Sequence, residues 1–184
     1  HKGWDEKKDT INRADHIICI SENTRKDLIE LFDVDIDKTS VVHLAYESSE
    51  TIENKGLDDQ RPFLLYVGWR EWYKNFKPFL MSISRSKSIM NDFDIIAFGG
   101  GVFTLEELKL MRKLGFRDGQ VRQISGSDKL LAKYYSQAKA FVFPSLYEGF
   151  GLPPLEAMSY NCPVISSNSS CMPEVIGDAA EYFD

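Results

Sequence analysis

Two glutamates separated by seven residues, Glu148 and Glu156, have the types and the spacing to bind a polar ligand. Gly149, Phe150 and Gly151 follow the first, and a proline pair then begins a helix that carries Glu156 in its first turn. The first N–H groups of a helix have no partner within it and attract anions. A carboxylate beside them can accept hydrogen bonds from sugar or ribose hydroxyls. The simpler alternatives are a helix-stabilising glutamate and an exposed loop acid.

Two basic residues, Arg70 and Lys74, follow an apolar run at 63–67 and a turn at Gly68. A guanidinium and a nearby ammonium suit a diphosphate, and the glycine lets the backbone approach such a ligand closely. The alternative is a solvated loop with two ordinary surface cations. Spacing alone leaves both interpretations open.

The elements that must position these residues alternate between apolar runs and helical stripes. We expect strands at 63–67, 93–98, 121–124, 140–143, 163–166 and 181–183. Helical periodicity separates them at 76–83, 105–114, 128–138, 154–160 and 173–176. Strands joined by helical crossovers predict an α/β fold with a Rossmann-like parallel sheet and helices on both faces.

Ligands of such sheets bind beyond the carboxyl ends of the strands. The unusual loops of this chain all follow expected strands: Gly68 to Asn75, Gly99 to Gly101, Gly126, Pro144 to Glu156, and Ser167 to Ser170. We therefore expect them to meet at one edge and form a binding site. Taken singly, each glycine could simply end a strand.

The first 60 residues follow a different pattern. Strands are expected at 17–20 and 40–44 with a helix at 24–32 between them, and the polar stretch 47–61 is expected to link two units. The formal net charge of −6 argues against a protein that coats nucleic acid or anionic membranes. Three cysteines without a C-x-x-C pattern favour reduced thiols in the cytoplasm. No apolar run approaches the ~20 residues of a membrane span.

The segment 143–167, Phe-Pro-Ser-Leu-Tyr-Glu-Gly-Phe-Gly-Leu-Pro-Pro-Leu-Glu-Ala-Met-Ser-Tyr-Asn-Cys-Pro-Val-Ile-Ser-Ser, closely resembles the group 1 glycosyltransferases. These are retaining, nucleotide-sugar-dependent enzymes whose GT-B fold has two Rossmann-like domains. Glu148 and Glu156 match their Glu-x7-Glu motif. The stretch 66–75 is similar to their diphosphate-binding loop, and 13–24 to their last strand before the domain crossover.

The resemblance implies a domain arrangement. Residues 1–58 would be the tail of the N-terminal, acceptor-binding domain with its linker, and 59–184 most of the C-terminal, donor-binding domain. On this expectation the chain is a fragment that lacks most of the N-terminal domain and the final helix. Such a fragment is expected to have no turnover by itself.

The resemblance also implies roles for individual residues. Arg70 and Lys74 would hold the donor diphosphate, Glu148 would contact the donor sugar at its reacting centre, and Glu156 would bind the ribose hydroxyls. The catalytic set is therefore Glu148, Arg70 and Lys74. The remaining donor-binding positions are Gly68, Gly99, Gly100, Gly101, Ile124, Gly126, Phe150, Gly151 and Leu152: the loop at 124–126 takes the base, and the amides at 150–152 take phosphate.

The implied reaction moves a hexose, with mannose favoured, from a GDP- or UDP-sugar to a glycan or lipid-linked acceptor with retention, in polysaccharide biosynthesis. The resemblance implies no metal ion and no cofactor. Nucleic acid is not an expected partner, and peripheral membrane association would come through the missing domain, at the inner face of the membrane. The alternatives are a sugar-nucleotide epimerase or phosphorylase on the same fold, and a non-catalytic nucleotide-binding module.

Overall fold

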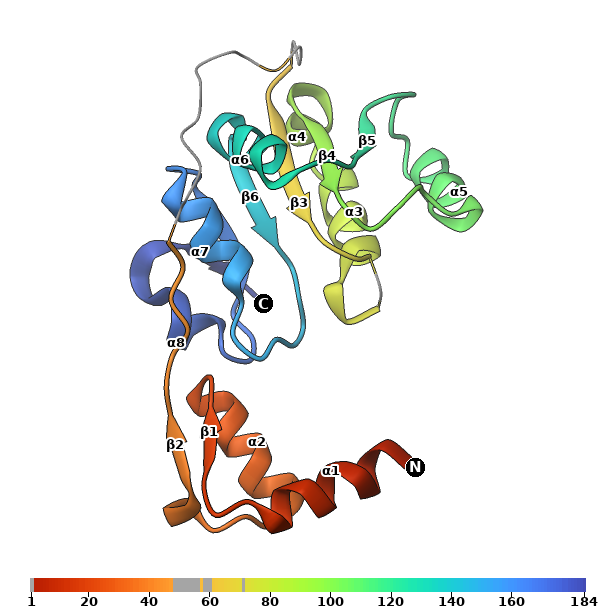
Figure 1. The fold of residues 1–184 in the computed structure, drawn as a ribbon. Coiled ribbons are helices and arrows are strands. Elements are labelled where there is room, and N and C mark those ends of the chain that lie inside the picture. Colours follow the sequence, from red (N-terminus) through yellow and green to blue (C-terminus); the bar gives the residue numbers. More distant parts are fainter. Residues whose placement is uncertain (1, 48–56, 58–60, 71) are drawn as a thin grey trace.

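A computed structural model describes residues 2–47, 57, 61–70 and 72–184, which form a smaller and a larger part (Figure 1). The smaller part contains helix α1 (Lys2–Arg13), strand β1 (Ile17–Cys19), helix α2 (Glu22–Phe32), a short 3-10 turn (Ile36–Lys38) and strand β2 (Thr39–Val41). The strands β1 and β2 pair in parallel. The expected boundary near residue 58 lies outside the described residues.

The larger part is built on a six-stranded sheet in the order β5-β4-β3-β6-β7-β8. Its strands are β3 (Phe63–Val67), β4 (Asp94–Phe98), β5 (Val121–Ile124), β6 (Ala140–Phe143), β7 (Val164–Ser167) and β8 (Glu181–Phe183). Every neighbouring pair is parallel, which confirms the expected sheet. The chain order reverses between β3 and β6, and that reversal is where doubly wound sheets bind ligands.

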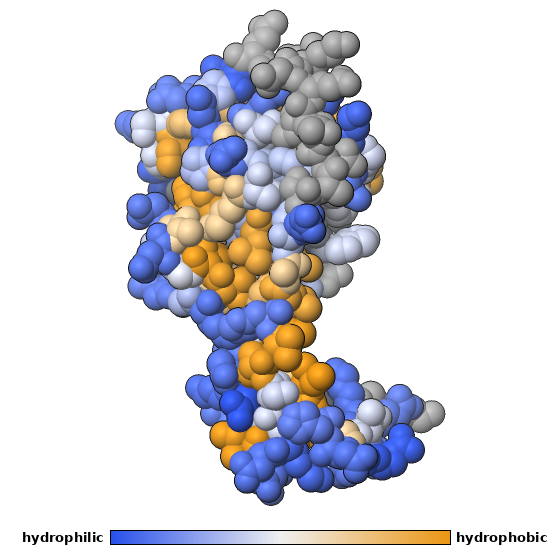
Figure 2. All heavy atoms as spheres, turned by 60° about the vertical axis from the view of Figure 1, so that its left-hand side comes forward, coloured by the Kyte–Doolittle hydropathy of each residue, from blue (hydrophilic) through white to orange (hydrophobic). Residues whose placement is uncertain are grey.

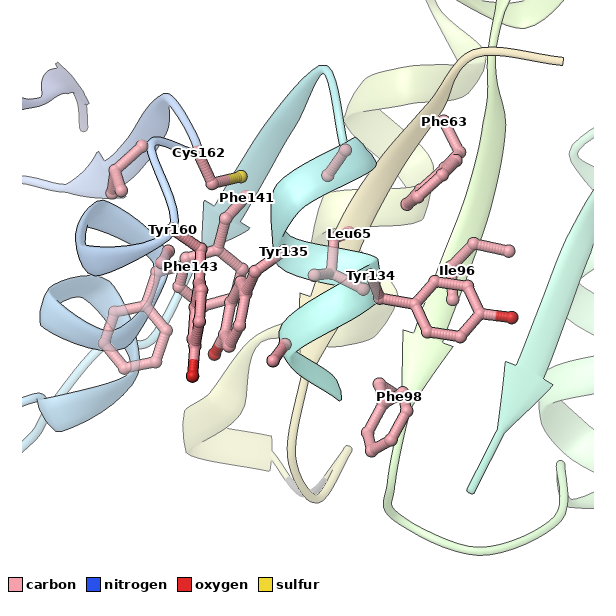
Figure 3. Packing of buried hydrophobic residues seen from close by; sticks show 14 of the residues in the cluster. Phe63, Leu65, Ile96, Phe98, Tyr134, Tyr135, Phe141, Phe143, Tyr160 and Cys162 are labelled. Carbon is pink, nitrogen blue, oxygen red and sulfur yellow. The ribbon is translucent and has the colours of Figure 1, made fainter. Parts of the chain in front are cut away.

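Helices cover both faces of this sheet. They are α3 (Phe76–Ser84), α4 (Lys87–Asp92), α5 (Leu105–Lys113), α6 (Asp128–Gln137), α7 (Leu152–Ser159) and α8 (Met172–Ile176), with 3-10 turns at Trp72–Lys74 and Gly177–Ala179. One core cluster joins the sheet to α6, α7 and α8, and a second joins it to α3 and α5. Figure 3 shows the first, in which Tyr135 meets Phe141 edge to face.

The central position of β3 in the sheet explains why its sequence is continuously apolar. Phe63 and Leu65 belong to one core cluster, whereas Leu64 and Tyr66 belong to the other. All four side chains are buried, because a central parallel strand has a helical layer on each face.

The helix expected at 105–114 is observed as α5 (Leu105–Lys113). Thr104 caps α5 in a capping box with Glu107, and Gly115 follows that helix with a φ of 84°. The expectation for Glu156 was wrong in one respect. Helix α7 begins at Leu152 after Gly151 takes a left-handed conformation, so Glu156 is its fifth residue and lies in the second turn.

Two helices were not expected from the sequence, α1 and α4. The six residues of α4 include none that is buried, so no apolar stripe marks the helix. Among the described residues, no helix has the length and the apolar composition that would let it cross a membrane.

Candidate functional site

The reversal of strand order brings together two predicted site residues from different loops. Lys74 follows β3, Glu148 follows β6, and the Lys74 Nζ lies 2.7 Å from the Glu148 Oε1. The lysine side chain is 17% exposed and the glutamate side chain 16%. The alternatives of a surface cation and an exposed loop acid therefore do not describe this pair.

Aromatic rings and backbone bonds hold the ammonium in place. Its Nζ lies 5.4 Å from the ring centre of Tyr73 and 5.7 Å from that of Phe143. The Leu146 N–H donates to the Tyr73 carbonyl at 2.8 Å, which ties the loop of Lys74 to the loop of Glu148. The two charges are thus fixed relative to each other by the backbone as well as by their own contact.

Arg70 has different partners from Lys74. Its side chain is 5% exposed, and its Nε lies 2.7 Å from the Oε1 of Glu107, which is equally buried. The guanidinium also donates to the carbonyls of Gly99, Gly101 and Val102 at 3.0–3.2 Å. In this structure Arg70 anchors the glycine loop after β4, and its role as a diphosphate ligand stays a prediction.

The pKa of Glu107 reflects its contacts with Arg70 and Thr104. Burial pushes the pKa upward, but hydrogen bonds from the Arg70 guanidinium and the Thr104 backbone outweigh burial, so the net pKa lies below the ordinary value. The carboxylate therefore stays charged and paired at neutral pH.

The glycines after β3 and β4 let these two loops pack closely. Gly68 has a φ of 115°, and the three glycines at 99–101 all have positive φ. A Cβ on Gly100 would lie 2.6 Å from the Arg70 Nη1 and 2.7 Å from the Gly68 carbonyl oxygen. Glycine is required there because the Gly68 carbonyl and the Arg70 guanidinium approach closely.

Glu156 is half-buried and has different partners from the Lys74–Glu148 pair. Its carboxylate accepts a hydrogen bond from the Tyr135 hydroxyl at 3.2 Å. Burial raises the pKa of Glu156; the bond from Tyr135 opposes that rise, and the nearby Asp128 carboxylate adds to it. The residue lines a cavity of about 250 Å³ with Tyr46, Glu47, Asp128, Leu131, Ala132, Tyr135 and Tyr160.

The loop expected to take a base leads into one wall of this cavity. Ile124 ends β5 and packs against the core, and Gly126 precedes α6, whose first residue is Asp128. A Cβ on Gly126 would lie 2.5 Å from the Leu130 Cδ2, so a larger residue would press on the helix. The structure thus places the predicted loop beside the cavity that Glu156 lines.

The N-terminus of α7 has fewer backbone N–H donors than an ordinary helix N-terminus. Phe150 is 5% exposed, Gly151 has a φ of 92°, and Leu152 is the first helical residue. Two of the first four residues of α7 are prolines, which have no N–H. Any anion held there would depend on Leu152 and on the amides before it.

Sequence reasoning did not foresee that the smaller part holds the loop of Glu148. The Ser21 Oγ lies 2.7 Å from the Gly149 carbonyl, and the Thr24 Oγ1 lies 3.1 Å from it. Glu174 accepts from the Glu22 N–H at 2.7 Å. A serine three residues before Thr24 is a helix N-cap signal, but it does not reveal which loop the hydroxyls would meet.

Among the residues that the structure describes, no group of three or more His, Cys, Asp or Glu side chains could hold a metal ion.

Comparisons with known proteins show the family to which the chain belongs. A family profile described as "Glycosyl transferases group 1" matches residues 47–183. The O-antigen chain mannosyltransferase B of Escherichia coli is 31% identical over 96% of this chain and 49% of its own length. The O-antigen chain mannosyltransferase RfbU of Salmonella typhimurium is 29% identical over 95% of this chain and 48% of its own. The chain spans about half the length of these curated relatives.

A solved structure shares the fold. WaaG, a glycosyltransferase involved in lipopolysaccharide biosynthesis, superposes with a TM-score of 0.75 and 17% identity over 90% of this chain and 48% of its own.

Proposed function

Because the chain belongs to the group 1 glycosyltransferases, we propose that it binds a nucleoside-diphosphate sugar where β3 and β6 diverge. The whole enzyme would transfer a hexose from that donor, with retention, to a glycan or lipid-linked acceptor in polysaccharide synthesis. Mannose and a GDP donor are favoured because two relatives of the chain are named O-antigen chain mannosyltransferases. The three unpaired thiols support a place in the reducing cytoplasm.

The observation that carries this proposal is the Lys74–Glu148 pair. An ammonium and a carboxylate 2.7 Å apart, each less than a fifth exposed, lie at the reversal of strand order. Partly buried charges interact more strongly than surface charges because solvent screens them less. A diphosphate that displaced the carboxylate from Lys74 would gain a fixed cation.

In the proposed reaction the bond between the sugar C1 and the diphosphate oxygen breaks, and the acceptor oxygen bonds to C1 on the same face. The acceptor proton passes to the departing diphosphate. Lys74 would offset the charge that builds on the leaving group, and Glu148, released from Lys74, would contact the sugar. We propose that these protein groups act without a metal ion.

The experiment is a calorimetric titration of the chain with GDP and with UDP. We expect Lys74→Ala to weaken binding about tenfold or more, which is about 1.4 kcal/mol. Lys77→Ala is the matched control, because that exposed lysine pairs only with exposed Glu106 among the described residues and should keep its affinity. Glu148→Gln should leave GDP affinity unchanged or tighter, since it frees Lys74.

Two further titrations separate the roles. Glu156→Ala should weaken GDP binding but leave pyrophosphate binding unchanged, because pyrophosphate has no ribose. Adding EDTA should leave GDP affinity unchanged. Absence of binding at millimolar GDP and UDP would contradict the proposal, and equal losses for Lys74→Ala and Lys77→Ala would remove Lys74 from it.

A further inference from the structure

The smaller part contacts the residues on either side of Glu148. Before it, the Tyr147 hydroxyl bonds to Asp27. After it, Ser21 and Thr24 both direct hydroxyls at the Gly149 carbonyl. In Figure 1 the smaller part lies beyond the ends to which β3 and β6 point, on the side of this loop.

The hydroxyl network is partly buried and centres on Ser21. Ser21 is fully buried, and its Oγ accepts the Thr24 N–H at 3.0 Å while lying 2.7 Å from the Gly149 carbonyl. A serine oxygen can accept one bond and donate another, so the same atom caps α2 and holds the loop. The Thr24 hydroxyl reaches the same carbonyl at 3.1 Å.

A second route from α2 reaches the Glu148 backbone itself. The Asn23 side-chain amide lies 3.2 Å from the Ser170 Oγ. That Oγ lies 2.7 Å from the Glu148 carbonyl and 3.3 Å from the Glu148 N–H. Both peptide groups that flank the Glu148 side chain are therefore held by Ser170, which Asn23 of α2 contacts. The next peptide carbonyl, that of Gly149, is held directly by Ser21 and Thr24.

Ile20 and Phe150 add apolar surface beside this polar network. Figure 2 shows hydrophobic residues gathered where the smaller and larger parts meet. A Cβ on Gly149 would lie 3.4 Å from the Ile20 Cδ1, and the Phe150 ring centre lies 5.9 Å from that of His43. Hydrogen bonds shielded in this way resist competition from water.

We propose that Ser21 and Thr24 are positioning residues for Glu148. By fixing the Gly149 carbonyl they orient the adjoining peptide, so that the Glu148 carboxylate meets Lys74 and, in the proposed function on which this inference rests, the donor sugar. The donor site is then complete only while the first turn of α2 is docked on the loop. The Gly149 carbonyl oxygen is thus one of the contacts that couple the two parts of the chain.

The first measurement is hydrogen–deuterium exchange of peptides covering 145–152, which needs no donor. Thr24→Val keeps the side-chain shape and removes the hydroxyl, and Ser21→Ala removes the other. We expect the double variant to exchange about tenfold faster in this segment, as loss of two buried bonds predicts. Replacing Thr24→Val by Thr24→Ser in the double variant restores a hydroxyl at position 24. The exchange rate should then fall to that of the Ser21→Ala single variant.

Matched controls separate positioning from loss of stability. Ser86→Ala removes the N-cap of α4, and Thr10→Val removes a hydroxyl that bonds to the Glu6 carbonyl within α1. Neither should change exchange at 145–152. Unchanged exchange in the double variant, or equal acceleration in the β4 segment 94–98, would overturn the proposal.

The second measurement compares the affinities for GDP-mannose and GDP. In the Ser21→Ala, Thr24→Val double variant, the ratio of the GDP-mannose affinity to the GDP affinity should fall about tenfold. The GDP affinity itself should stay within about twofold of the wild type. Parallel losses for both ligands would show a merely structural role. Failure of the wild type to bind GDP or UDP would contradict the proposed function alone, because the exchange result reads the positioning separately.

Discussion

Arg70 and Lys74 are four positions apart in one loop, yet they have different electrostatic surroundings. The Arg70 side chain is 5% exposed and bonds to Glu107 and to carbonyls of the glycine loop, whereas Lys74 is 17% exposed and pairs with Glu148. The planar guanidinium suits a fixed, multidentate structural contact. The ammonium can exchange one anionic partner for another.

Removal of the Arg70 guanidinium should destabilise the fold strongly. Arg70→Gln leaves the Glu107 carboxylate buried without its partner, and breaking such a pair costs about 3–5 kcal/mol. We expect a corresponding drop in the unfolding free energy measured in urea. Lys77→Gln, which breaks an exposed pair, should cost at most about 1 kcal/mol.

Low pH should remove the stabilisation that the Arg70–Glu107 pair gives the fold. Since the pKa of Glu107 is lowered in the folded chain, its stabilisation is present above the ordinary glutamate pKa and is lost as pH falls through the lowered value. Wild type should therefore lose stability more steeply in acid than Glu107→Gln does. Parallel acid curves for the two proteins would contradict the importance of the pair.

The sequence predicted which residues of this loop are unusual but not which partner each would meet. Glycine after an apolar run indicates the end of a strand, and a basic residue beside it indicates anion binding. Arg70 meets Glu107 because β3 lies beside β4, a fact of strand order that a loop sequence does not contain. The spacing of Thr104 and Glu107 is that of a capping box, a local signal that places Glu107 in the first turn of α5.

At the scale of elements, the start of α2 is tied to a carboxylate of the larger part. The first turn of α2 receives the Glu174 carboxylate from α8, which lies 2.7 Å from the Glu22 N–H and 3.2 Å from the Asn23 N–H. The His43 ring nitrogen lies 2.6 Å from the same carboxylate. A residue of the larger part thus completes the capping of a helix in the smaller part.

Glu174→Gln should destabilise the docking of α2. The variant loses a carboxylate at the positive end of the helix dipole, which is worth about 1–2 kcal/mol when partly buried. Burial raises the pKa of Glu174, but bonds from the Glu22 N–H and from His43 outweigh burial and lower it overall. Wild type should therefore lose this advantage as pH falls below the ordinary glutamate range, and the variant should not.

Thermal unfolding with Glu106→Gln as control measures this effect. Glu106 also lies in a first helical turn, that of α5, but its side chain is 83% exposed. Its replacement should cost no more than about 0.5 kcal/mol. Equal losses in the two variants would show that the cap across the two parts adds nothing special.

The strands were predictable because their periodicity is strong, and most of the helices because apolar residues recur along one side of the helix. Helix α3 has Phe76, Phe79, Leu80 and Ile83 on its buried face, and the sequence shows that stripe. Helix α4 lacks one, so only its N-cap Ser86 could have indicated it. The docking of α2 on the Glu148 loop depends on tertiary contacts between residues more than 120 positions apart.

At the scale of the whole molecule, the three cysteines should be unreactive until the chain unfolds. All three are free and buried. Burial raises the pKa of the Cys162 and Cys171 thiols to about 11 each, and it raises that of Cys19 as well. A thiol with a raised pKa has little thiolate at neutral pH and reacts slowly.

Ellman's reagent at pH 7.5 tests this expectation. The native chain should release almost no thionitrobenzoate within minutes, and the chain in guanidinium should release three equivalents, one for each cysteine. Rapid reaction of one thiol in the native chain would show that its burial is transient. Cys19→Ser would then tell whether the smaller part is the one that opens.

The strand order also has a consequence for synthesis. Lys74 and Glu148 are 74 positions apart, and β3 meets β6 on the edge opposite β4. At a ribosomal rate of about 5–20 residues per second, about 4–15 seconds separate the appearance of the two charges. Throughout that interval one edge of β3 has no strand beside it, and unpaired edges invite association with other chains. We therefore expect the strand order at the proposed ligand site to make the nascent chain prone to association with other chains until β6 pairs with β3.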